Sequence, residues 1–234
     1  MPYDKKSFTA GIAVGRQLKG WATGGNGGQP IPPADLVPVE WVRTYGAGLD
    51  TGLSGADKNL VVEIKYLPDA TGLAENSIFG AAWDYSGFFL MCYGSYYRWH
   101  TRGTARNSVI ASTVTPAIII CDYFGYSVNG VYYETGSGTR ANYDYPIILL
   151  NRPPDAGGSH PTSNNGVSHG RFYYCKIWRE GILVRHYLPY AVKIGATDFG
   201  VIYEAISGEI SLGAYYSGSG LPGFEAGPEL LPEG

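Results

Sequence analysis

The sequence is poor in charge, in cysteine and in long apolar runs. Only 16% of its 234 residues are charged, and its 17 Lys and Arg form no basic run, so the electrostatic footprint of a nucleic-acid-binding protein is absent. No stretch approaches the ~20 apolar residues that a transmembrane helix needs. The apolar stretch 8–14 is too short for a secretory signal and lacks a cleavage pattern. We therefore expect a soluble protein that binds no nucleic acid and does not insert into a membrane.

The three cysteines, Cys92, Cys121 and Cys175, each lie in an apolar, strand-like run and none forms a CxxC pair. Free cysteine is among the most buried residue types, so we predict buried free thiols rather than disulfides. This pattern indicates synthesis in a reducing cytosol. A virion component released by lysis fits it, and so does an ordinary cytosolic protein.

The residues that are abundant describe an all-β protein. With 34 Gly, 20 Tyr and 15 Pro, the chain reads as about a dozen short strands separated by turns, with no convincing helix after residue 20. A hydrophobic content of 44% supplies a core. No repeat of fixed period emerges, which excludes a propeller or solenoid. Two packed antiparallel sheets are the architecture that this pattern predicts.

The clearest local signal is the stretch 171–189, RFYYCKIWREGILVRHYLP. Two apolar and aromatic runs flank Glu180-Gly181, and a glycine there permits the positive φ of a tight hairpin turn. Large side chains occupy both alternating sets of positions in the first run, so we expect that strand to be covered on both faces. Asn129-Gly130 marks a second hairpin.

These motifs resemble the concanavalin A-like (laminin G-like) jelly-roll module of bacteriophage and prophage tail, fibre and baseplate-associated proteins and of bacterial surface proteins. The resemblance implies a two-sheet antiparallel jelly-roll sandwich. The sequence departs from the family pattern at Tyr190, where a Cys is common, and in the loop 155–169. The motifs that carry the resemblance are Tyr174-Cys175-Lys176-Ile177-Trp178, Leu183-Val184-Arg185, Tyr187-Leu188-Pro189, residues 40–52, Gly200-Val201-Ile202-Tyr203 and residues 218–229.

Composition divides the chain into four parts. Residues 1–20 are basic and rich in small side chains, and we interpret them as a short helical or extended anchor that docks into a larger assembly; the alternative is a frayed tail. Residues 21–34 form a Gly/Pro-rich linker. The jelly-roll domain is expected at 35–220, followed by an acidic surface tail at 221–234. The candidate anchor side chains are Phe8, Ile12, Arg16 and Leu18.

The sequence does not indicate catalysis. A glycosidase needs two carboxylates about 5–10 Å apart across a cleft, and the Glu-x-Asp-x-x-Glu arrangement of jelly-roll glycosidases is absent. Glu204 and Glu209 flank the Ser207-Gly208 turn, where we expect exposure to water rather than the buried setting of a catalytic acid. The histidines lack metal-ligand spacing and no loop holds a dense Asp/Asn array. We predict no catalytic residue, no metal site and no cofactor.

The conspicuous feature is instead an excess of aromatic residues from position 83 to 99, followed by His100 and Arg102. Aromatic faces stack on the apolar faces of sugar rings, and Arg or His at a rim bonds hydroxyl groups. The alternative is that most of these rings are core or cross-strand pairs. The candidate carbohydrate-binding residues, in or beside turns, are Tyr85, Trp99, Arg102, His160 and Asn164.

Together, the resemblance and the anchor, linker and sandwich order favour a non-enzymatic bacteriophage virion protein, made in the bacterial host cytoplasm. It would be a tail, fibre, baseplate or capsid-decoration component that adheres to a host-surface glycan. Its expected partners are other virion proteins, contacted through the N-terminal segment, and the protein would be present in several copies. A cellular carbohydrate-binding module and a glycan-cleaving enzyme remain as alternatives.

Overall fold

The computed structural model describes residues 32–45, 47–69, 76–81, 88–101, 104–134, 144–151, 168–194, 197–211 and 224–230. Within these ranges the chain forms seventeen strands and no helix, and the strand pairings are antiparallel. The predicted anchor and linker, including Phe8, Ile12, Arg16 and Leu18, lie outside the described residues.

The larger sheet has eleven strands and runs in the order β1-β14-β15-β17-β2-β13-β4-β9-β10-β11, with β16 paired to β15 and an additional pairing between β13 and β14. Its strands are β1 (Leu36–Pro38), β2 (Val42–Tyr45), β4 (Leu60–Pro68), β9 (Ala117–Cys121), β10 (Gly125–Val128), β11 (Val131–Glu134), β13 (His169–Arg179), β14 (Ile182–Ile194), β15 (Thr197–Glu204), β16 (Ile210–Ser211) and β17 (Phe224–Ala226).

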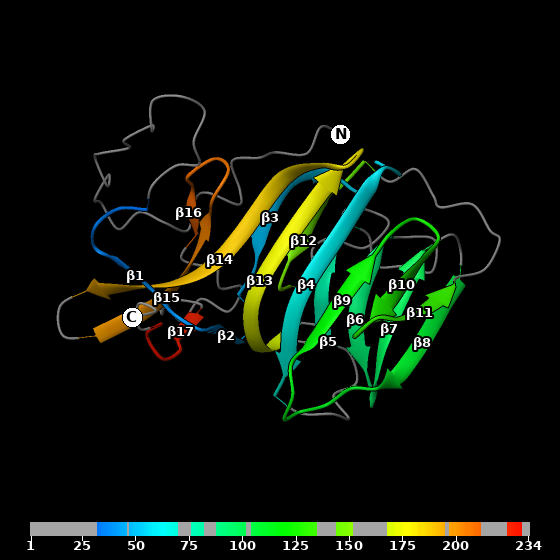
Figure 1. Cartoon of the computed structure of the whole chain (residues 1–234), viewed down its shortest axis with the longest axis horizontal. Helices are drawn as coiled ribbons and strands as arrows, with labels where there is room; N and C mark the ends of the chain where they lie inside the picture. Colours follow the sequence, from blue (N-terminus) through cyan, green and yellow to red (C-terminus); the bar gives the residue numbers. More distant parts are fainter. Residues whose placement is uncertain are drawn as a thin grey trace.

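The smaller sheet has six strands in the order β3-β12-β5-β6-β7-β8. Figure 1 looks onto the larger sheet: β9, β4, β13 and β14 cross the front of the molecule, and the strands of the smaller sheet lie behind them. The predicted all-β, two-sheet antiparallel jelly-roll sandwich is confirmed. The strands of the smaller sheet are β3 (Leu49–Ser54), β5 (Asn76–Gly80), β6 (Phe89–Tyr93), β7 (Tyr96–Thr101), β8 (Thr104–Ile110) and β12 (Pro146–Leu149).

Both predicted hairpin turns are confirmed. β13 and β14 turn at Glu180 and Gly181, whose φ angles are 52° and 80°, and β10 and β11 turn at Asn129 and Gly130, with φ angles of 50° and 82°. Two successive residues with positive φ define the tight turn whose twist matches that of the flanking strands. The glycine at the second position adopts this conformation without steric cost.

The core fills the space between the two sheets. Alternate residues of the central strands, such as Ile64, Ile119 and Ile177, face inward from the larger sheet, and Phe79 and Leu90 meet them from the smaller one. The three cysteines are buried free thiols, as predicted. Burial raises the pKa of the Cys92 thiol to about 11, so it remains protonated at neutral pH and is unreactive.

The C-terminal part of the chain corrects one prediction. Residues 224–226 form β17, which pairs with β2 and β15, and Phe224 is buried in the core. Glu229 forms a further bridge to Val39. The predicted boundary of an acidic tail at residue 221 is therefore wrong, because this segment completes the larger sheet through partners that are distant in sequence.

Candidate functional site on the outer face of the larger sheet

The structure removes Trp99 from the predicted carbohydrate-binding residues. Trp99 lies on β7 and is fully buried. Its ring packs edge-on against Phe88, with ring centroids 4.7 Å apart, and lies 5.6 Å from the ring of Phe79. The expectation of an exposed ring beside a turn is wrong, because the period-two alternation of β7 directs Tyr97 and Trp99 together into the core.

The other predicted ligand residues, Tyr85, Arg102, His160 and Asn164, lie outside the described residues. The structure does, however, describe both ends of the segment 152–167. On one side the Ser77 hydroxyl donates to the Asn151 carbonyl at 3.0 Å, and on the other Asn76 bonds the backbone of His169. The two ends of the segment are thus fixed at adjacent residues of β5.

A different surface brings functional side chains together: the outer face of β4 and β13. Here a β-bulge places two residues of β13 opposite one residue of β4, because Phe172 pairs with Tyr66 and Tyr174 pairs with Lys65. Phe172 faces the core, and Tyr173 and Tyr174 both lie on the outer face. β-Bulges re-aim side chains and are common next to functional sites.

We call this surface the outer-face cluster. Its side chains include three aromatic rings, three cations and one carboxylate, and the members Lys176, Tyr174 and Trp178 are each partly exposed. Sequence alternation predicted large side chains on both faces of β13, but the expected cover on the outer side is not complete. The outer-face cluster comprises Glu63, Lys65, Arg171, Tyr173, Tyr174, Lys176 and Trp178.

Glu63 holds one half of the cluster together. Its carboxylate lies 4.0 Å from the Lys176 ammonium group and accepts a hydrogen bond from the Tyr174 hydroxyl. Lys176 in turn lies 5.2 Å from the centroid of the Tyr174 ring. Burial, followed by the contact with Glu63, raises the pKa of Tyr174 to about 12. Tyr174 therefore stays a neutral hydrogen-bond donor, and its ring is held in place.

The other half contains cations that lie over aromatic rings. The Lys65 ammonium group is 4.8 Å from the centroid of the Tyr173 ring, and the Arg171 guanidinium is 4.7 Å from that of Trp41. Such contacts are worth about 0.5–1 kcal/mol at exposed sites. They position the charged groups without removing their charge.

Two cross-strand rows define the surroundings of the cluster. One row runs through Ile120, Glu63, Lys176 and His186, and another pairs Val61, Trp178 and Leu183. Burial lowers the pKa of His186, and Lys176 opposite adds to this effect, although Glu204 and Glu63 oppose it. His186 is therefore neutral at pH 7, so it offers a hydrogen-bonding ring beside the cluster rather than a further charge.

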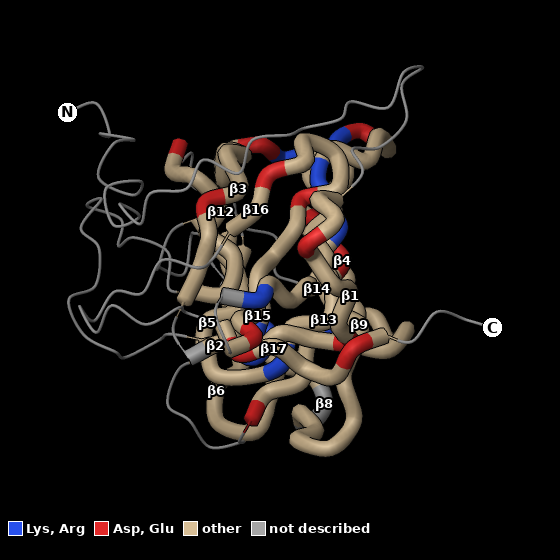
Figure 2. Tube along the Cα trace, turned by 90° about the vertical axis from the view of Figure 1, so that its left-hand side faces the viewer, with Lys and Arg blue, Asp and Glu red and all other residues tan. Residues whose placement is uncertain are grey.

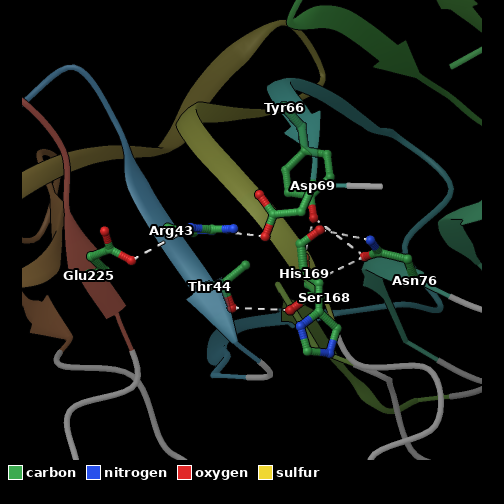
Figure 3. Close-up of polar contacts among 8 residues, drawn as sticks. All are labelled: Arg43, Thr44, Tyr66, Asp69, Asn76, Ser168, His169 and Glu225. Carbon is green, nitrogen blue, oxygen red and sulfur yellow. Dashed lines mark hydrogen bonds and ion pairs between the residues drawn. The ribbon is translucent and has the colours of Figure 1, made fainter. Parts of the chain in front are cut away.

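β13 is fixed at both ends. At its start, shown in Figure 3, Ser168 bonds the Tyr66 hydroxyl at 2.7 Å, and the Asn76 amide of the smaller sheet donates to the His169 carbonyl at 2.9 Å. At its end Arg179 forms an ion pair with Asp57 at 2.6 Å. A binding surface needs this kind of support to keep its side chains in place.

The carboxylate of Glu204, which lies near the cluster, has a structural role. Glu204 is buried and accepts hydrogen bonds from the backbone N–H groups of His186, Ile206 and Ser207 at 2.6–3.1 Å. This corrects the expectation that the turn exposes Glu204 to water. Through these backbone donors its carboxylate stabilises the β15–β16 turn.

Across the described ranges, no group of three or more His, Cys, Asp or Glu side chains could hold a metal ion. In the same ranges, no helix is both long and apolar enough to cross a membrane. In the view of Figure 2, acidic and basic positions are interspersed along the described trace and do not gather into a large region of one sign. The outer-face cluster is thus a local arrangement of charges and rings.

Comparisons with known proteins do not assign a family. No protein-family model matches the chain, and no curated protein is significantly similar to it.

Proposed function

We propose that this chain is a non-enzymatic structural protein of a bacteriophage virion, whose jelly-roll sandwich adheres to a host-surface glycan through the outer-face cluster. The resemblance of its hairpin motifs to phage tail, fibre and baseplate-associated modules supports the virion part of the proposal. The arrangement of rings and polar groups on an open sheet face supports the adhesion part.

The observation that carries the proposal is the set of partly exposed rings on β13. Tyr174 and Trp178 are four residues apart on one strand, which corresponds to roughly 13 Å along the sheet. Rings this far apart suit separate, non-adjacent units of a chain-like ligand, and the polar groups between them suit its hydroxyls. An open sheet face of this kind binds an extended glycan without enclosing it.

The same geometry favours binding over hydrolysis. Three cross-strand rows run across the outer-face cluster, and Glu63 is the one carboxylate among their residues. The rows are 118, 65 and 174; 120, 63, 176 and 186; and 61, 178 and 183. Glycoside hydrolysis needs a second carboxyl group about 5–10 Å from the first. Glu63 instead makes contacts with Tyr174 and Lys176.

A glycan array, followed by affinity measurements on any glycan that binds, tests the adhesion part. We expect Trp178→Ala and Tyr174→Ala each to weaken binding about tenfold or more, which corresponds to about 1.4 kcal/mol. Tyr93→Ala is the matched control, because Tyr93 is a partly exposed ring of the smaller sheet that also lies next to a cation, Arg98, at 3.7 Å. Its binding should equal that of the wild type.

Two results would contradict this part of the proposal. If the array shows no binding, an architectural decoration replaces the adhesin. If a bound polysaccharide releases reducing ends, the protein is an enzyme. Circular dichroism of each variant separates lost contacts from lost folding.

The assembly part depends on residues 1–20. Their basic, small-residue composition, followed by a Gly/Pro-rich linker, supports a role as the anchor to other virion proteins. We expect deletion of residues 1–20 to abolish incorporation into the particle and to leave the sandwich folded. Equal incorporation of the truncated protein, measured by mass spectrometry of purified particles, would refute this role.

A further inference from the structure

The cations of the outer-face cluster differ in how their charge is balanced. Lys176 lies beside Glu63. Within the described ranges, Lys65 lies over the ring of Tyr173. Arg171 lies over the ring of Trp41 and bonds the Tyr173 hydroxyl. An aromatic ring attracts a cation but does not neutralise it.

A neighbouring arginine shows the contrast. Arg43 on β2 is the register partner of Arg171 on β13, so the two guanidinium groups share one face of the sheet. Arg43 lies 2.9 Å from Asp69 and 3.9 Å from Glu225, as Figure 3 shows. Two carboxylates therefore balance the charge of Arg43, whereas no carboxylate of the described residues forms an ion pair with Arg171.

Around Tyr173 the balance is positive. Lys65 and Arg171 approach it, and the carboxylate that acts on it is the exposed Glu40. Glu63, the acid nearest along β4, is already engaged by Lys176 and Tyr174. Among the described residues, two cations face one exposed carboxylate, which leaves this half of the cluster with a surplus positive charge.

We infer that the outer-face cluster selects acidic glycans, with Lys65 and Arg171 receiving a sugar carboxylate while Tyr174 and Trp178 stack on the sugar rings. The inference rests on the proposed function and names its ligand class. The planar guanidinium suits a carboxylate because it donates two parallel hydrogen bonds, and the ammonium group of Lys65 adds a second charge. An uncharged sugar would gain the stacking contacts only.

The test compares each acidic glycan that binds on the array with the same glycan after chemical reduction of its carboxyl groups to alcohols. We expect the acidic form to bind about tenfold or more tightly at low salt, and the preference to shrink as the ionic strength rises. Lys65→Gln should remove most of the preference while leaving the stacking contribution.

Lys58→Gln is the matched control, because Lys58 also lies over a ring, that of Tyr123 at 5.7 Å, but belongs to the β3–β4 turn outside the cluster. It should keep the full preference for acidic glycans. If Lys58→Gln and Lys65→Gln have equal effects, the charge of the cluster does not select the ligand and the inference is wrong.

The outcomes separate the inference from the proposed function. Equal binding of the acidic and reduced glycans, combined with a loss in Trp178→Ala, overturns the acidic class and leaves adhesion through the cluster standing. Binding of neutral glycans alone has the same consequence. Absence of binding to every glycan overturns both.

Discussion

The two outer faces of the sandwich differ in what they leave to solvent. On the larger sheet, the side chains of Glu63 and Lys176 are 21% and 35% exposed and lie among aromatic rings. On the smaller sheet, Ile148, Phe89 and His100 occupy one cross-strand row and are 1%, 2% and 4% exposed. In this row the smaller sheet is closed to solvent, whereas the charged groups and rings of the outer-face cluster on the larger sheet remain partly exposed.

This difference is not visible in the composition of single strands. β9, AIIIC, and β6, FLMCY, are both short apolar runs. In β9 the residues alternate between buried and exposed, so Ile118 and Ile120 are 40% and 38% exposed on the outer face. In β6 the first four residues are all buried. The exposure of a strand's residues depends on the chain segments that pack against its two faces. These segments are set by the tertiary structure and not by the composition of the strand.

The largest expected effect is a difference in unfolding free energy between a variant of the smaller sheet and a variant of the larger sheet. Phe89→Ala on the smaller sheet should lower the free energy of unfolding by about 3–5 kcal/mol, since it removes a fully buried ring. Ile120→Ala on the larger sheet should cost roughly 1 kcal/mol, because much of that side chain is already in water. Urea unfolding followed by circular dichroism measures both values.

Equal losses for the two variants would mean that both outer faces are buried to the same extent. The slope of the unfolding free energy against urea should stay unchanged in both variants, which shows that the effect lies in stability rather than in the unfolded state.

The second expected effect is a loss of stability at low pH that depends on His100. Burial, followed by the nearby Arg98 charge, lowers the pKa of His100 to about 3, and its ring stacks on Phe89 with centroids 4.1 Å apart. The unfolded chain takes up the proton near pH 6.5 and the folded chain does not, so the stability from neutral His100 is present above about pH 6.5 and is lost as the pH falls. Between about pH 6.5 and 4.5 the loss should reach roughly 2–3 kcal/mol.

His100→Gln is the control for this titration. Whatever its stability at a single pH, the slope of its unfolding free energy between about pH 6.5 and 4.5 should be smaller than that of the wild type by up to about 1.4 kcal/mol per pH unit. His186 on the larger sheet has a pKa shifted in the same direction. Identical slopes in wild type and His100→Gln would show that His100 protonates without cost.

Local features of the fold could be predicted from the sequence. The turns at Glu180-Gly181 and Asn129-Gly130 follow from residues that adopt positive φ, and this cause acts within four residues. The two-sheet architecture follows from the number and spacing of the strands. These parts needed no knowledge of distant contacts.

The candidate site could not be predicted in the same way. Strict alternation put Tyr173 on the side of Cys175 and Ile177, but the bulge opposite Lys65 moves it to the outer face. The position of a bulge depends on the register between β13 and β4, which are more than one hundred residues apart in the chain. β17 was missed for a similar reason, because its three residues gain their stability from β2 and β15 rather than from each other.

The smallest expected effect concerns the ion pair of the cluster itself. The Lys176 and Glu63 groups are 4.0 Å apart and partly exposed, and such pairs contribute about 0.2–1 kcal/mol. In a double-mutant cycle of Glu63→Gln and Lys176→Gln, we expect a coupling energy for unfolding at the low end of this range, falling further as salt is added. A coupling above about 2 kcal/mol would mean that the pair holds the fold together, and that this face is structural like its counterpart on the smaller sheet. A small coupling, in contrast, would mean that the sandwich does not depend on these charges, so that their arrangement around the rings of β13 is available for a ligand.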